Sequence, residues 1–206
     1  GSSGMLVFSS GSSSTGNSGL IKIGTGASTE GRGGEVVISV GSGTSGSGGL
    51  LSAHAGRSTV TTGGSLSLDS GEGTATTSGD VFIRSVNGGT SGGSGMLVFS
   101  SGISTAGNSG HIHIGSGAAT QGRSGGIMVS VGSGTSGSGG MMVAKAGRSI
   151  LNTGGSLLLS AGEGAATTSG YISVRSVNAG SSGSSGMLVF SSGVSSAGNS
   201  GSINIG

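Results

Sequence analysis

The sequence repeats itself at two nested periods, and this repetition constrains the fold more than any other feature. The segment Met5–Gly11 returns at Met96–Gly102 and again at Met187–Gly193, which gives a period of 91 residues. Residues 5–95 and 96–186 are identical at 60 of 91 aligned positions. We call each 91-residue segment a super-repeat. Internal repetition at fixed periods predicts an array of similar structural units and not one globular core.

Each super-repeat contains six short repeats, five of 15 residues and a sixth of 16. Position 2 of every short repeat is apolar, and position 4 is apolar too, a period of two that is typical of β-strands. The last position is always Gly, position 7 is Gly in the 15-residue repeats, and position 9 is always small. The short repeats begin at Met5, Leu20, Glu35, Leu50, Ser65 and Asp80, then at Met96, His111, Gly126, Met141, Ser156, Tyr171 and Met187.

Composition excludes several classes of protein. The 206 residues include 52 Gly and 48 Ser, only 7% are charged and 2% aromatic, and there is no Pro or Cys. Collagen is excluded because Gly does not recur at every third residue, and disulfide scaffolds are excluded because Cys is absent. A flexible linker is the first suggestion of such a composition. The 31% of hydrophobic residues argue against a linker, because they recur in register.

The pattern predicts an all-β fold, a narrow parallel β-solenoid in which each short repeat is one coil. Positions 1–6 would form one strand, Gly at position 7 would turn the chain, and positions 8–11 would form a shorter strand. The apolar residues at positions 2 and 4 would face the small residue at position 9 in the core. Coils would stack about 4.8 Å apart, the spacing of hydrogen-bonded strands. Handedness and the number of faces stay open.

The repeat boundaries predict one continuous solenoid. Residues 1–4 would end a preceding coil, residues 5–95 and 96–186 would be two super-repeats, and residues 187–206 would start a third. Solenoids need polar capping repeats, and no such repeat is present here. We therefore expect the array to be a fragment of a longer chain, or copies of it to associate end to end.

Apolar residues also occupy positions 1, 3 and 5, which would face outward. Exposed apolar columns usually mark a contact surface, so we expect lateral packing of this face against another copy. The proposed lateral contact face consists of Met5, Val7, Val37, Leu50, Phe82, Met96, Val98, Met128, Met141 and Val143.

Two other alignments along the array are candidates for a role. Arg57 and Glu72 share position 8 of consecutive coils, as do Arg148 and Glu163, which predicts two inter-coil ion pairs. Threonines at position 10, with two at position 12, resemble the flat Thr arrays of ice-binding β-solenoids, which is the alternative function. These threonines are Thr29, Thr44, Thr59, Thr61, Thr74, Thr76 and Thr90.

No enzyme is predicted, because no catalytic, cofactor-binding or metal-ligating constellation recurs. His111 and His113 could supply two metal ligands, but no carboxylate recurs beside them. The eight basic residues are scattered and aromatic residues are few, which argues against nucleic-acid binding. No apolar run approaches the ~20 residues that cross a bilayer. The Ser- and Thr-rich exterior could accept O-linked glycans.

Three motifs carry a resemblance to known proteins: Ser-Gly-x-Leu-x-Phe-Ser-Ser-Gly, Gly-Asn-Ser-Gly-x-Ile-x-Ile-Gly and Gly-Glu-Gly-x-Ala-Thr-Thr-Ser-Gly. The chain resembles the Gly/Ser-rich repeat arrays of large secreted or cell-surface proteins of diatoms and related algae. The resemblance implies an extracellular setting and no known activity. Together with the repeats, it predicts a structural protein that builds a hair, matrix fibre or adhesive strand by associating with itself, end to end and laterally.

Overall fold

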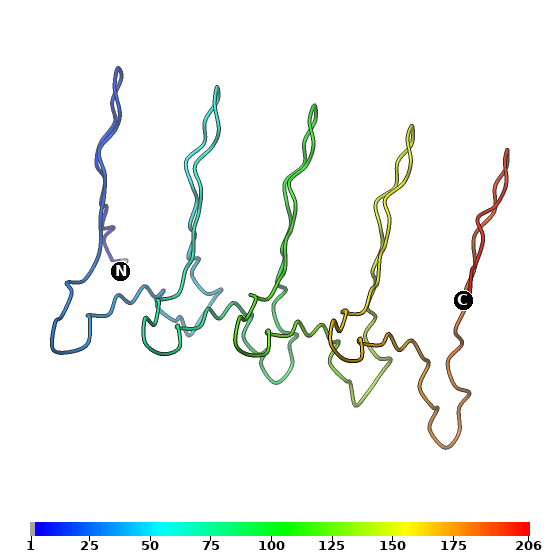
Figure 1. Cartoon of the computed structure of the whole chain (residues 1–206). Coiled ribbons are helices and arrows are strands. Elements are labelled where there is room, and N and C mark those ends of the chain that lie inside the picture. The colour runs from blue at the N-terminus through cyan, green and yellow to red at the C-terminus, as the bar shows by residue number, and fades with distance from the viewer. Residues whose placement is uncertain (1–2) are drawn as a thin grey trace. The chain divides into compact units, whose positions relative to one another are not determined.

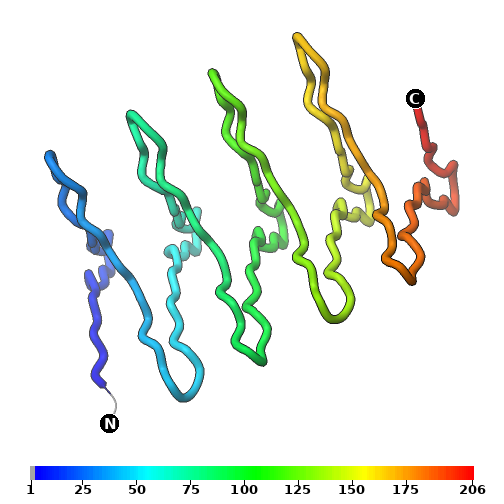
Figure 2. The backbone as a smooth tube through the Cα atoms, turned by 90° about the horizontal axis from the view of Figure 1, so that it is seen from below, coloured from blue at the N-terminus to red at the C-terminus, as the bar shows by residue number. Residues whose placement is uncertain are grey.

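Residues 3–206 form a series of irregular loops without regular secondary structure. The computed structural model describes residues 3–206, and these residues contain no helix and no strand. The predicted all-β solenoid is therefore wrong. The Cα trace divides into two parts, Gly1–Ser100 and Ser101–Gly206, and within each part the short repeats run outward and back as loops (Figures 1 and 2).

Every complete short repeat bends at one place. The described residues contain thirteen bends of three residues each, and each bend directly follows the small residue at position 9. The first two bends are residues 14–16 and 29–31, and the same place recurs throughout, with a shift of one residue in the 16-residue repeats. The predicted short strand at positions 8–11 is thus replaced by a bend.

The glycine at position 7 does not turn the chain as predicted. No bend is assigned at position 7 in the described residues. Gly11 and Gly193 adopt positive φ angles of 85° and 78°, but the other described glycines at position 7 do not. Two further glycines with positive φ, Gly46 and Gly137, lie within bends and are copies of each other one super-repeat apart.

The last glycine of each short repeat closes the loop against position 6. A Cβ atom built on this glycine would come within 4 Å of the side chain at position 6 in all thirteen complete repeats. The closest cases are Gly49 against Val40 Cγ1 at 2.5 Å and Gly140 against Val131 Cγ1 at 2.6 Å, followed by Gly34 against Thr25 Cβ at 2.7 Å. Loops of this size whose ends meet resemble Ω-loops. In the three repeats that end at Gly34, Gly49 and Gly140, a side chain at the last position would collide with its own loop, whereas in the other ten its nearest contact would be 3.1 Å or longer.

Hydrogen bonds reinforce the closure in two ways. In some repeats the N–H of the last glycine donates to the carbonyl of position 7, as in Gly64 to Gly56 at 2.8 Å and Gly79 to Gly71 at 2.9 Å. The same bonds recur one super-repeat later with the same lengths. In other repeats the hydroxyl at position 6 donates to the carbonyl of the last glycine, as from Ser10 to Gly19 at 2.9 Å.

The loops leave the side chains without a core. No described residue is buried, and the chain exposes 20525 Å². A folded monomer of 18.9 kDa would expose roughly 8,300 Å², and its fully unfolded chain roughly 27,000 Å². The predicted core at positions 2 and 4 is therefore wrong. A segment becomes a β-strand only when another segment pairs with it, and without such pairs no sheet forms to cover these side chains.

The closure predicts where a disulfide can form in this cysteine-free chain. The Cβ of Ser70 lies 3.6 Å from a Cβ built on Gly79, within the range that disulfides require. We expect the double variant Ser70→Cys, Gly79→Cys to form an intramolecular disulfide with an effective concentration about tenfold above that of Gly71→Cys, Gly79→Cys, a difference of ~1.4 kcal/mol. Titration with a glutathione redox buffer measures both values. Equal values would contradict the closure, because a Cβ at Gly71 meets only open space.

A second prediction concerns the glycine that closes the second short repeat. Gly34→Ala would place a methyl group against the Thr25 side chain, so we expect the nuclear Overhauser contact between the Thr25 methyl and residue 34 to be lost. Gly26→Ala is the matched control, because a Cβ there meets no atom within 4 Å. The contact should persist in the control. Its survival in Gly34→Ala would show that the loop does not require glycine at its end.

Candidate self-association surface

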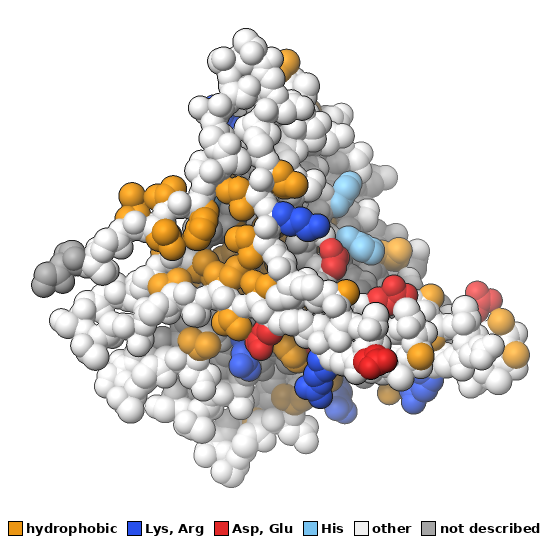
Figure 3. Space-filling model, turned by 90° about the vertical axis from the view of Figure 1, so that its left-hand side faces the viewer, with side chains coloured by type: hydrophobic (Ala, Val, Ile, Leu, Met, Phe, Trp, Pro, Cys, Tyr) orange, Lys and Arg blue, Asp and Glu red, His pale blue; other side chains and the backbone are white. Residues whose placement is uncertain are grey.

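The most distinctive surface of the chain is its regular series of uncovered apolar side chains. At position 2 the exposed fractions of the large side chains run from 47% for Leu97 to 79% for Leu6. Position 4 is equally uncovered, with Phe8 at 74%. Apolar exposure on this scale is unusual for a monomeric protein. Figure 3 shows hydrophobic side chains lying open at the surface, with charged side chains close to some of them.

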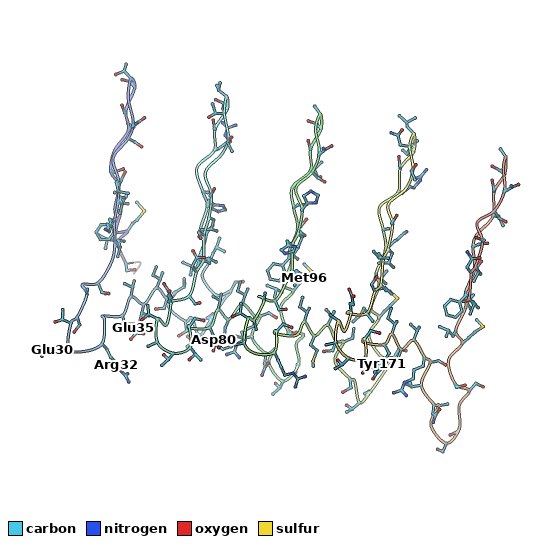
Figure 4. All side chains as sticks on the ribbon, viewed as in Figure 1. Glu30, Arg32, Glu35, Asp80, Met96 and Tyr171 are labelled. Atoms are coloured by element: carbon cyan, nitrogen blue, oxygen red, sulfur yellow. The ribbon has the colours of Figure 1, made fainter. Side chains whose placement is uncertain are left out.

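The residues of the proposed lateral contact face are also exposed. Met5 and Met128 are each 90% exposed, and the remaining eight residues are all large hydrophobic side chains open to solvent. Met96 and Tyr171, which occupy position 1 in different repeats, are labelled in Figure 4. Position 1 is more exposed than position 2, but no position is buried, so the structure draws no boundary between an inner and an outer face. The apolar surface therefore includes positions 2 and 4 of every short repeat, and positions 1 and 3 in those repeats where these residues are apolar.

One part of this surface is hollowed into a groove. A cavity of about 520 Å³ lies between residues 67–70 and residues 80–83, at the junction of two consecutive short repeats. Leu68, Val81 and Phe82 line it together with two carboxylates. The corresponding residues of the second super-repeat include neither carboxylate and no Phe. Leu159, Ile172 and Val174 keep the corresponding positions of the second super-repeat apolar, whereas the two carboxylates occur in the first super-repeat alone.

The predicted ion pairs are not formed within residues 3–206. Arg57 and Glu72 have no salt bridge there, and neither do Arg148 and Glu163. The prediction depended on coils stacked one strand spacing apart, and the described residues contain no such stack. Figure 4 shows that other charged side chains, such as Glu30 and Arg32, project from a bend and its immediate neighbourhood.

The threonines of the alternative ice-binding face lie in bends. Each of the seven threonines belongs to a three-residue bend. Thr59 and Thr61 share one bend, Thr74 and Thr76 share another, and the remaining three lie in separate bends. An ice-binding array requires hydroxyls on a flat, regular strand surface, and the described residues contain no strand. The structure therefore provides no such lattice.

The hydroxyl groups fall into three classes that the sequence alone did not separate. At position 6, the hydroxyls of Ser10, Thr25 and Ser116 donate to the carbonyl of the last glycine of the loop. At position 9, four serines accept the N–H of the residue that ends the bend, as in Ser13 with Gly16 at 3.0 Å and Ser58 with Thr61 at 2.9 Å. At the first residue of the bend, the hydroxyls within residues 3–206 make no hydrogen bond to the chain. Only the spacing of three between positions 9 and 12 could have indicated the second class.

No group of three metal-ligating side chains is brought together in the part of the chain that the structure describes. In residues 3–206 no three His, Asp or Glu side chains converge on a common point, and His111 and His113 acquire no third partner. No helix among these residues is long and apolar enough to cross a membrane.

Comparison with known proteins gives no relative. No family model, no curated protein and no solved structure matches the chain. The apolar surface and the bends therefore have to be interpreted from their own chemistry.

Proposed function

We propose that the chain is a structural protein whose repeats associate with other copies of themselves to build an extracellular or cell-surface fibre. The observation that carries this proposal is the surface of 20525 Å², on which no residue of the described range is buried. Each apolar side chain that becomes covered contributes about 1.5–3 kcal/mol. A chain with this many uncovered apolar residues in register is stabilised by a partner that repeats with the same period.

A second copy of the chain is the partner that fits this surface. The apolar residues at positions 2 and 4 recur in thirteen complete short repeats, and the whole pattern recurs after 91 residues, so two copies match when they are shifted by one super-repeat. Linked contacts of this kind raise avidity without new interactions. The net charge of +2 produces little repulsion between copies. The extended segments also keep backbone N–H and C=O groups available for pairing between chains.

The experiment is sedimentation velocity of the purified, unmodified chain over a hundredfold range of concentration. We expect the average mass to rise with concentration, and electron microscopy to show elongated assemblies. Association driven by apolar burial should weaken on cooling and should resist high salt. A monomer at all concentrations would overturn the proposal.

A pair of variants identifies the surface. Replacing Leu97 and Ile112 by Ser removes two apolar side chains at position 2 of consecutive short repeats, and we expect the midpoint concentration of assembly to rise about tenfold or more. Replacing Gly102 and Gly117 by Ser is the matched control, because these glycines at position 7 have open space around them and no positive φ. If both variants assembled equally well, position 2 would not belong to the contact surface.

A further inference from the structure

The bends carry a regular series of hydroxyl groups for which the loops have no structural use. Thr or Ser is the first residue of eleven of the thirteen bends, and the exceptions are Ile150 and Ala165. All eleven residues are exposed. The neighbouring hydroxyl at position 9 differs in four repeats, because Ser13, Ser58, Ser104 and Ser149 each accept the N–H of the residue that ends the bend, as Ser104 does from Gly107 at 3.0 Å.

This difference decides which hydroxyl can react. A hydroxyl attacks an electrophile through its oxygen lone pair, and a lone pair already accepting a backbone N–H is less available. The position-6 hydroxyls, such as Ser10 and Thr25, are similarly held by the loop closure. The hydroxyl at the first bend residue is unbonded, exposed and presented on a protruding loop, where modifying enzymes gain access most readily.

We propose that the first residue of each bend is an O-glycosylation site, giving one sugar per short repeat in eleven of the thirteen. The site deepens the proposed function, since it depends on the extracellular setting through which a chain meets glycosyltransferases. The hydroxyl oxygen of Thr or Ser attacks the anomeric carbon of a nucleotide-activated N-acetylhexosamine. The new carbon–oxygen bond forms, the bond to the diphosphate oxygen breaks with its electron pair, and the hydroxyl proton passes to a base of the transferase.

The test uses the full 206-residue chain secreted from cultured animal cells in which O-linked sugars stop at a single N-acetylgalactosamine. Peptide mass spectrometry with electron-transfer fragmentation locates each sugar. We expect sugars on first bend residues such as Thr105 and Thr120, and none on the adjacent Ser104. Sugars on position-9 serines as often as on first bend residues, or a chain that carries no sugar, would overturn the proposal.

Two bends without the hydroxyl permit a gain-of-function variant. Ile150→Thr should add one sugar per chain at residue 150, while Ile150→Val, which has nearly the same shape but no hydroxyl, should add none. Thr105→Val should remove one sugar without moving it to Ser104. Absence of a sugar at residue 150 in Ile150→Thr would count against the proposal. Mass spectrometry detects the sugar whether or not the chains assemble. A missing sugar would therefore contradict this proposal alone, whereas the sedimentation experiment on the unmodified chain tests assembly separately.

Discussion

The contact between the last glycine and position 6 of each short repeat determines the rest of the structure. It closes a loop of ten residues, and this places the bend at positions 10–12, at its far end. Ordering one residue costs about 1–2 kcal/mol, whereas one hydrogen bond contributes about 0.5–1.5 kcal/mol net. The closure therefore defines the shape of a loop without stabilising the loop by itself. Stability has to come from apolar surface that the loop cannot cover.

The closure explains some of the glycines in the chain and leaves others unexplained. At the last position, a Cβ atom would collide with Thr25, Val40 or Val131 in three of the repeats. At position 9, Gly73 and Gly164 have no room for a side chain, because the carbonyls of Thr77 and Thr168 stand too close. At position 7 the surroundings are open, and only Gly11 and Gly193 need the freedom of glycine for a positive φ. Glycine at position 7 therefore has a different role from glycine at the last position.

The sequence predicted some features of the fold and not others. The period, the invariant last glycine and the small residue at position 9 all correspond to features of the loops. The alternation at positions 2 and 4 predicted strands and a core, and neither is present within residues 3–206. Alternation specifies an extended backbone with apolar side chains on one face, but it does not specify which segment pairs with it. The residues of the proposed lateral contact face were expected to be exposed, and they are, whereas their role in contacts between copies stays a prediction. The bend hydroxyls were assigned to a strand.

Assembly and modification make opposite demands on a surface, and the short repeat separates them along the chain. The apolar residues at positions 2 and 4 precede the closure, and the hydroxyl at the first bend residue lies beyond it, at the far end of the loop. A hydrated sugar on that end adds bulk and polarity away from the apolar residues, which a second copy would cover. In the repeats containing Ile150 and Ala165, the bend lacks the hydroxyl, and in the first of these Leu151 is 91% exposed as well. There the apolar surface extends to the tip of the loop, so contacts between copies can reach further than in the other repeats.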